Sequence, residues 1–140
     1  MFIDTNVLVA SRFLEAPNHD IARARLERAF RDPDPLRISR QVLREYLAVV
    51  TRPQTWAVAI PRDEALDDLQ RLMNRFQILE DGPAVSNSLV ALCREVVVGG
   101  RQIHDANIVA TMLAHGERRL LTLNSADFRR FGDRIELVGG

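Results

Sequence analysis

The chain has 140 residues, of which 46% are hydrophobic and 27% are charged. This composition is typical of a globular protein and excludes intrinsic disorder, fibrous repeats and low-complexity architecture, and the length predicts a single domain over residues 1–140. The formal net charge is zero, with 19 basic and 19 acidic residues. A bulk basic field for nonspecific nucleic-acid binding is therefore absent, and any contact with nucleic acid has to be local.

Cysteine and histidine usage narrows the possible chemistry. Cys93 is the only cysteine, which excludes an intramolecular disulfide and a cysteine zinc cluster. His19, His104 and His115 are far apart and lack zinc-ligand spacing. The acidic N-terminal segment does not resemble a signal peptide, and no apolar run reaches the roughly 20 residues that span a bilayer. We therefore expect a cytoplasmic protein without membrane contact.

Short apolar runs alternate along the chain with longer amphipathic stretches, which predicts strands alternating with helices. In chain order, the sequence predicts a strand at 1–3, a helix through 7–10, a helix at 19–30, a strand at 36–38, a helix from 39 to about 51, a helix from 61 to about 75, a strand at 77–79, a helix at 83–98, a helix at 105–115, a strand at 120–123, a helical turn at 125–131 and a strand at 135–138.

This alternation predicts an α/β fold with a largely parallel sheet. Asn18 and Ser39 are candidate helix N-caps, and Gly99-Gly100 is a candidate helix stop. In open parallel sheets, binding sites form beyond the carboxyl ends of the strands. Asp4 and Asn124 both directly follow a predicted strand, so this edge is where we expect chemistry.

Two carboxylates have both a structural and a functional interpretation. Asp4 could simply cap the helix that follows it. Glu45 shares a helix face with Val42 and Val49, so it lies along an apolar stripe, where a carboxylate is costly unless it is paired or bound to metal. A salt bridge from Glu45 to an arginine elsewhere is the structural alternative.

The same ambiguity holds near the C-terminal motifs. Asp105 shares a face with Ile108 and Met112 and is predicted to point inward, yet a first-turn acid also stabilises the helix dipole by about 0.3–1 kcal/mol. Asn124 could cap the following turn, and Asp127 could be its first-turn acid.

The combination of these residues favours a functional site. Several carboxylates that converge on one crevice repel each other and raise each other's pKa, and a hard divalent cation relieves that repulsion. Carboxylates without histidine suit Mg²⁺ or Mn²⁺ better than zinc. Such sites typically serve phosphoryl chemistry.

Four segments, in their order and spacing, resemble the motifs of PIN-domain nucleases, most closely the VapC-type toxins of bacterial toxin–antitoxin systems. They are MFIDTNVLV, SRQVLREYLAVVTRP, IHDANIVATMLAHG and LLTLNSADF. The resemblance runs from Met1 to about Val138. It implies a three-layer α/β/α fold around a short, mostly parallel central sheet.

The resemblance also implies a set of site residues. Asp4, Glu45 and Asp105 match the three acids of the family, and Asn6 matches a common supporting polar group. The fourth position departs from the family pattern, because Asn124 stands where many members have an aspartate. Either Asn124 orients a ligand or water there, or the nearby Asp127 supplies the fourth charge.

The function implied by the resemblance is Mg²⁺- or Mn²⁺-dependent hydrolysis of RNA phosphodiester bonds, with tRNA or rRNA as the substrate class. It further implies a homodimer and neutralisation by a VapB-type antitoxin, whose C-terminal segment wraps the toxin. Six arginines flank the motifs and either contact phosphates or form a solvated face: Arg40, Arg44, Arg118, Arg119, Arg129 and Arg130.

Two alternatives belong to other classes. A catalytically silent PIN-like module that binds RNA or protein would retain the fold, although inward-facing charges without a metal cost stability. An aspartyl-phosphate phosphatase needs a second acid after the first strand, where this chain has Asp4-Thr5-Asn6. The absence of a glycine-rich turn there excludes a P-loop or Rossmann enzyme.

Overall fold

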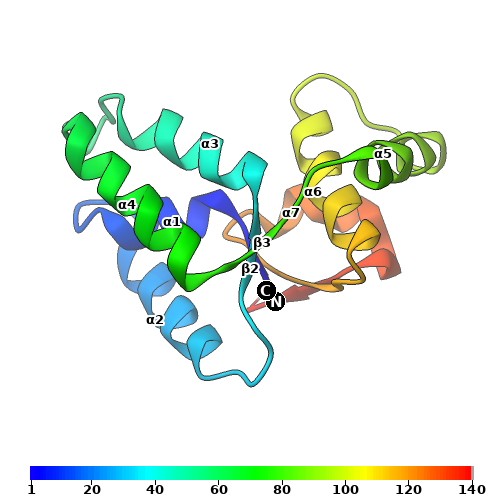
Figure 1. The fold of residues 1–140 in the computed structure, drawn as a ribbon, viewed down its shortest axis with the longest axis horizontal. Coiled ribbons are helices and arrows are strands. Elements are labelled where there is room, and N and C mark those ends of the chain that lie inside the picture. Colours follow the sequence, from blue (N-terminus) through cyan, green and yellow to red (C-terminus); the bar gives the residue numbers. More distant parts are fainter. Residues whose placement is uncertain (140) are drawn as a thin grey trace.

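The computed structural model describes residues 1–139 as five short strands alternating with helices (Figure 1). The strands are β1 (Phe2–Ile3), β2 (Arg37–Ser39), β3 (Gln77–Leu79), β4 (Arg119–Leu121) and β5 (Glu136–Val138). The helices are α1 (Thr5–Arg12), α2 (His19–Phe30), α3 (Arg40–Val50), α4 (Arg62–Arg75), α5 (Pro83–Glu95), α6 (Gln102–Ala114) and α7 (Ser125–Phe128), followed by a 3₁₀ segment, η1 (Arg129–Arg134).

The strands form one parallel sheet in the order β3-β2-β1-β4-β5. The chain first winds outward from β1 to β2 and β3, and then returns to add β4 and β5 on the other side. The direction of winding therefore reverses between β1 and β4, where Phe2 pairs with Leu120. In such sheets the crevice beyond this reversal point is the usual ligand site.

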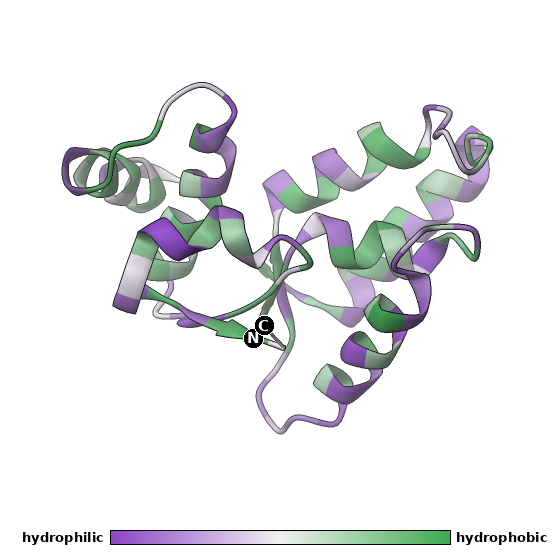
Figure 2. Cartoon of the chain, turned by 180° about the vertical axis from the view of Figure 1, so that it is seen from behind, coloured by the Kyte–Doolittle hydropathy of each residue, from purple (hydrophilic) through white to green (hydrophobic). Residues whose placement is uncertain are grey.

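Helices flank both faces of the sheet, which confirms the predicted α/β/α fold. Figure 1 shows α1 to α4 gathered on one side of the strands and α5 and α6 on the other, with the two chain ends close together. The strands are buried on both faces, and Phe2, Ile38 and Leu120 have no exposed surface. In Figure 2 polar and apolar colours both run along the helices, because each helix covers the sheet with one face only.

Helix boundaries follow from local chemistry where caps are strong. The Ser39 hydroxyl accepts a hydrogen bond from the backbone N–H of Val42 and so begins α3 as predicted. Pro83 occupies the first turn of α5, where a missing N–H costs nothing. Asn18 occupies the N-cap position of α2, but its side chain makes no cap hydrogen bond there.

Two predicted helix boundaries on the α5–α6 hairpin were wrong. Helix α5 ends at Glu95 and not at Val98, because three β-branched valines follow and Val96 adopts an extended conformation. Helix α6 begins at Gln102, three residues before Asp105. The positive φ of Gly100 (59°) turns the chain at once, and the Gln102 side chain accepts from the Gly99 N–H at 3.1 Å.

The region after β4 also differs from its prediction. The strand ends at Leu121 and not at residue 123, because the Thr122 hydroxyl accepts a hydrogen bond from the Asn124 N–H at 3.1 Å and turns the chain out of the sheet. The predicted turn over 125–131 is a short α-helix, α7, that continues into η1 through Arg134. Asn124 therefore lies three residues beyond the strand.

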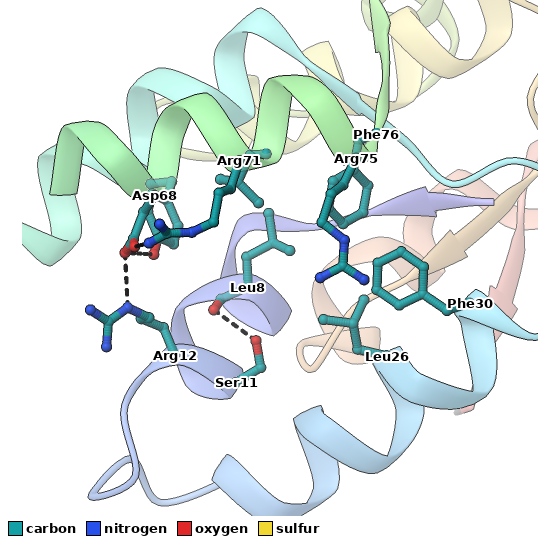
Figure 3. A pocket seen from close by; sticks show the side chains of 11 residues that line it. Leu8, Ser11, Arg12, Leu26, Phe30, Asp68, Arg71, Arg75 and Phe76 are labelled. Carbon is teal, nitrogen blue, oxygen red and sulfur yellow. Dashed lines mark hydrogen bonds and ion pairs between the residues drawn. The ribbon is translucent and has the colours of Figure 1, made fainter. Parts of the chain in front are cut away.

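Two buried carboxylates connect elements away from the carboxyl ends of the strands. Asp68 of α4 accepts hydrogen bonds from Arg12 of α1, Tyr46 of α3 and its neighbour Arg71, beside an apolar pocket (Figure 3). This cluster fixes α3 against α1 and α4, which matters below because α3 carries Glu45.

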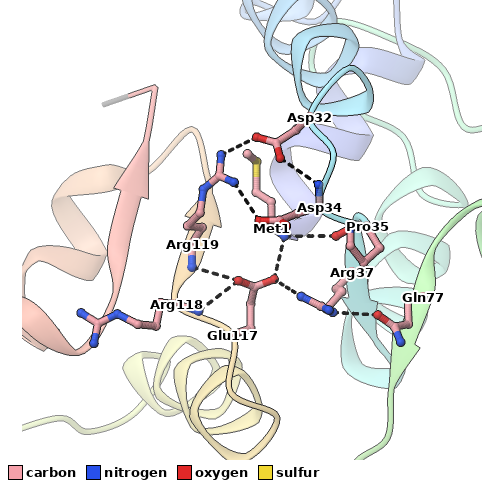
Figure 4. Close-up of polar contacts among 9 residues, drawn as sticks. All are labelled: Met1, Asp32, Asp34, Pro35, Arg37, Gln77, Glu117, Arg118 and Arg119. Carbon is pink, nitrogen blue, oxygen red and sulfur yellow. Dashed lines mark hydrogen bonds and ion pairs between the residues drawn. The ribbon is translucent and has the colours of Figure 1, made fainter.

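Glu117, just before β4, is the second buried carboxylate. It lies 2.6 Å from the amino group of Met1 and 2.8 Å from Arg37, and it accepts from the N–H groups of Arg118 and Arg119 (Figure 4). It thereby ties the beginnings of three neighbouring strands together. None of the helices formed by residues 1–139 combines the length and the apolar character needed to cross a membrane.

Candidate metal centre

The carboxyl ends of β1 and β4 meet at the reversal point of the sheet. The N–H of Asp4 donates to the Leu121 carbonyl at 3.0 Å, so Asp4 and Thr122 leave the sheet side by side. The Thr122 hydroxyl donates to Asp4 Oδ2 at 2.8 Å. The structure therefore places Asp4 at the edge where the sequence predicted chemistry.

Asp4 is 6% exposed and is held by neighbours on both oxygens. Its Oδ1 accepts from the Thr5 N–H at 2.8 Å, so it does cap α1, and its Oδ2 also accepts from the Asn6 amide at 3.2 Å. Asn6 additionally accepts from the Leu123 N–H at 3.1 Å. Asp4 can therefore cap α1 and also face the candidate site. Asn6 joins α1 to the loop after β4.

Glu45 is half-buried on the second turn of α3 and is not half of a salt bridge to arginine in the described residues. The Thr5 hydroxyl donates to its Oε2 at 3.0 Å, and the Gln41 amide donates to its Oε1 at 2.8 Å. These neutral donors orient the carboxylate without neutralising its charge.

Asp105 reaches the same edge of the sheet from the opposite layer. Helix α6 precedes β4 and runs antiparallel to it, so the first turn of α6 lies at the carboxyl ends of the strands. Asp105 is half-buried there. Gln41 links the two layers, since it donates to the His104 carbonyl at 3.0 Å and accepts from Asn107 at 2.8 Å.

A cleft of about 570 Å³ brings most of the predicted residues together. Its lining includes Asp4, Glu45 and Asp105 as well as Asn6 and Asn124. The remaining walls are largely apolar and come from α1, the loop before α2 and the C-terminal half of α3. This arrangement supports the hypothesis that five of the six predicted site residues face a common space.

Asp127 does not line this cleft. It is exposed and lines a neighbouring cavity of about 450 Å³, which shares Asn18, Leu123 and Asn124 with the cleft. Its charge is nevertheless close enough to raise the pKa of Asp105. Asp127 therefore stands beside the three acids and not among them.

Burial and mutual repulsion raise the pKa values of two of the acids, Asp4 and Asp105. Desolvation, together with the smaller effect of the Asp105 and Glu45 charges, raises the pKa of Asp4 from its usual 3.8 to about 6, although the hydrogen bonds from Thr122 and Thr5 lower it. Desolvation also raises the pKa of Asp105, as do Asp127 and Glu45, in that order. The carboxylates therefore interact electrostatically, as expected for groups around a cation site.

The donor set fits a hard divalent cation in chemical type. Within residues 1–139, no three His, Cys, Asp or Glu side chains are close enough to form a ready-made metal site. Mg²⁺, however, keeps several waters and is commonly held by only one or two carboxylates. Every buried side-chain nitrogen or oxygen in this part of the chain has a hydrogen-bond partner, and the carboxylates of Asp4 and Glu45 are oriented by such hydrogen bonds.

Four supporting residues were not predicted from the sequence: Thr5, Gln41, Asn107 and Thr122. Gln41 lies four residues before Glu45, a spacing that puts both on one helix face and could have indicated their contact. The partnership of Thr122 with Asp4 spans 118 positions and has no local signal.

The fold and site together define an α/β protein with a carboxylate-lined cleft at the reversal point of a parallel sheet. The family model described as PIN domain matches residues 1–134, and the chain belongs to this family.

A curated relative and two solved structures are similar to this chain. The chain is 29% identical over 132 residues to Ribonuclease VapC24 of Mycobacterium tuberculosis, covering 93% of this chain and 90% of the relative. A toxin–antitoxin complex from Klebsiella pneumoniae has a TM-score of 0.69 at 21% identity, covering 98% and 94% of the two chains. VapC20 of M. tuberculosis, described as a sarcin–ricin loop cleaving toxin, has a TM-score of 0.64 at 18% identity, covering 85% of each.

Proposed function

We propose that this protein is a Mg²⁺- or Mn²⁺-dependent endoribonuclease and the toxin of a VapBC-type pair. The observation that carries the proposal is the convergence on one cleft of Asp4, which follows β1, Glu45 from α3 and Asp105 from α6; burial, and less strongly the charges of Asp105 and Glu45, raise the pKa of Asp4. The similarity to a VapC ribonuclease over 93% of the chain supports the reaction type.

In this proposal Asp4, Glu45 and Asp105 would hold the cation, which when bound supplies Lewis-acid activation of water for phosphodiester hydrolysis. Thr122 and Asn6 fix the Asp4 oxygens, and Thr5 and Gln41 fix those of Glu45. Such neighbours commonly contribute 10–100-fold in metal affinity or activity, as an order of magnitude.

The proposed partners follow from similar proteins. One structural neighbour is a toxin–antitoxin complex, which supports an antitoxin partner for this chain. Another is described as cleaving the sarcin–ricin loop, which supports an RNA of the rRNA or tRNA class as substrate. We also propose a homodimer and a cytoplasmic location.

Removal of divalent cations tests the reaction. The purified protein is expected to cleave RNA with Mg²⁺ or Mn²⁺ and to lose this activity completely in excess EDTA, because no side chain in the cleft is an obvious alternative nucleophile. Gel analysis of total tRNA and rRNA measures the effect, with Asp4→Asn protein, purified in parallel, as the control for contaminating nuclease. Cleavage that persists in EDTA would contradict the metal mechanism. Cation binding without any cleavage would favour a silent binding module.

The fourth position of the family pattern, filled by Asn124 with Asp127 nearby, gives a second prediction. Asp127→Asn is expected to weaken Mn²⁺ binding or cleavage at least about tenfold, about 1.4 kcal/mol, because the Asp127 charge acts on Asp105. Asn124→Ala, which removes a neutral group from the cleft wall, should have a smaller effect. Calorimetric Mn²⁺ titration of both variants compares them. Unchanged affinity and turnover in Asp127→Asn, with only a lower melting temperature, would assign Asp127 to the α7 turn and leave three carboxylates.

A further inference from the structure

Two cavities adjoin the cleft on either side of β1, because α3 follows β2 and α7 follows β4, and these two strands flank β1 in the sheet. On one side a cavity of about 380 Å³ between α3 and α6 is lined by Gln41, Arg44, Glu45 and His104, and it shares Glu45 with the cleft. On the other side lies the cavity that contains Asp127, which shares part of its wall with the cleft. The acids therefore occupy the middle of a longer depression.

Arginines occur at both ends of this depression. Arg44 lines the cavity beyond Glu45, and Arg25 and Arg129 line the cavity beyond Asn124. Arg52 lines the central cleft itself. Within residues 1–139, none of these four guanidinium groups forms an ion pair with a carboxylate. They are available for an anionic ligand.

The arginines that flank the sequence motifs fall into two groups, those with a hydrogen-bond or ion-pair partner in the protein and those without an ion pair. Arg40 pairs with Glu80, Arg119 pairs with Asp32 and Asp34, and Arg118 donates to the Asp133 carbonyl. These three stabilise the fold. Arg44 and Arg129 instead lie exposed on the two sides of the cleft. Arg130 is also exposed and its charge acts on Asp105, but it lines none of these three cavities.

We propose that the cleft and its two flanking cavities form one track for the backbone of single-stranded RNA, in which Arg44 binds a phosphate on one side of the scissile bond and Arg129 binds one on the other. This inference rests on the proposed ribonuclease function. A phosphodiester that approaches three carboxylates is repelled, so attraction has to come from cations that flank them. Guanidinium groups suit this role because they bind phosphate oxygens through two parallel hydrogen bonds.

The lining also indicates which part of the RNA is recognised. The residues that line the three cavities include no Phe, Tyr or Trp, so the track lacks the aromatic platforms on which bases usually stack. Contacts to phosphate position a nucleic acid without reading its sequence. Because Asp4 lies 6% exposed at the base of the cleft, the strand has to bend inward, which a flexible single strand does more easily than a duplex.

Salt dependence of binding tests the track directly. Wild-type protein in EDTA, which prevents the proposed cleavage, is titrated against a short fluorescein-labelled single-stranded RNA of mixed sequence at several KCl concentrations. Each phosphate contact contributes about −0.7 to the slope of log K against log salt. Arg44→Ala and Arg129→Ala are each expected to reduce the slope by about 0.7, and the double variant by about 1.4. The same RNA annealed to its complement should bind more weakly.

A matched control and competing ligands make the outcome decisive. Arg94 is exposed on α5, outside these cavities, and has no carboxylate partner in the described chain, so Arg94→Ala should leave the slope unchanged. Equal effects of all three variants, equal binding of duplex RNA, or equal competition by a polyglutamate peptide would overturn the track. If Arg44→Ala and Arg129→Ala leave the salt slope unchanged while the wild-type protein cleaves RNA, the track is rejected and the ribonuclease function is kept. Reduced slopes in a protein that never cleaves with Mg²⁺ would reject the ribonuclease and keep the track.

Discussion

Replacing Asp4 with asparagine is expected to abolish RNA cleavage and at the same time to stabilise the metal-free protein at neutral and higher pH. Cleavage should fall at least about a thousandfold, about 4 kcal/mol, because asparagine brings no charge to the proposed cation. Glu45→Gln and Asp105→Asn should lose cleavage for the same reason. All three should show a smaller rise in melting temperature on addition of Mn²⁺, since that rise comes from binding to the native state.

The stability gain of Asp4→Asn follows from the sign of the pKa change. Burial raises the pKa of Asp4 from 3.8 to about 6, so the folded state binds more protons than the unfolded state between these values, and stability falls as pH rises through this window. Above pH ~6 the ionised carboxyl costs the folded protein roughly 3 kcal/mol. Asparagine removes this cost but loses the oxygen that accepts from Thr122 and Asn6, so a gain of roughly 1–2 kcal/mol is expected.

Urea unfolding in EDTA at pH ~8 and pH ~4 measures this gain, which should be present at the higher pH and absent at the lower one. A destabilised Asp4→Asn protein at the higher pH would show that Asp4 serves mainly as the cap of α1. Likewise, a Glu45→Gln protein that keeps its activity but loses several kcal/mol would show that Glu45 has a structural role.

Replacing Asp68 with alanine is expected to cost about 3 kcal/mol of unfolding free energy. Although burial opposes its ionisation, hydrogen bonds from Tyr46 and Arg12 hold the pKa of Asp68 below its ordinary value. Removing the carboxylate leaves the buried Tyr46 hydroxyl and the Arg12 guanidinium without this partner, and breaking such a buried pair costs about 3–5 kcal/mol. The lower end applies because Arg12 is partly exposed and also contacts Glu64.

Glu64 supplies the control, because it contacts the same Arg12 from the surface. Glu64→Ala should cost less than about 1 kcal/mol, as is usual for exposed pairs. In wild-type protein the Asp68 contribution is present above the unfolded-state pKa and is lost as pH falls through the lower folded-state pKa. The difference in unfolding free energy between wild type and Asp68→Ala should therefore shrink in acid. Equal costs of the two substitutions would contradict the central role of Asp68.

The sequence by itself determined the features that depend on neighbouring residues. Alternating apolar runs and amphipathic stretches predicted the α/β class, the Ser39 cap predicted the start of α3, and Asp4 was placed correctly beyond β1. These features are set by hydrogen bonds and side-chain periodicity within a few residues. The convergence of the carboxylates was a hypothesis built from the position of Asp4 after a strand and the inward faces of Glu45 and Asp105, and the family resemblance added the assignment of these three as the site acids.

Only the tertiary structure decided how the pieces meet. The strand order put β4 beside β1, so Thr122 became a hydrogen-bond donor to Asp4 across 118 positions, and the turn it makes moved Asn124 three residues away from its strand. The same packing placed Asp127 in a cavity of its own, apart from the three acids. It also placed one cavity beside the cleft at Glu45 and another beside it at Asn124. Such contacts arise when helices and strands pack around a common core, so they depend on residues distant in sequence and leave no periodic trace in it.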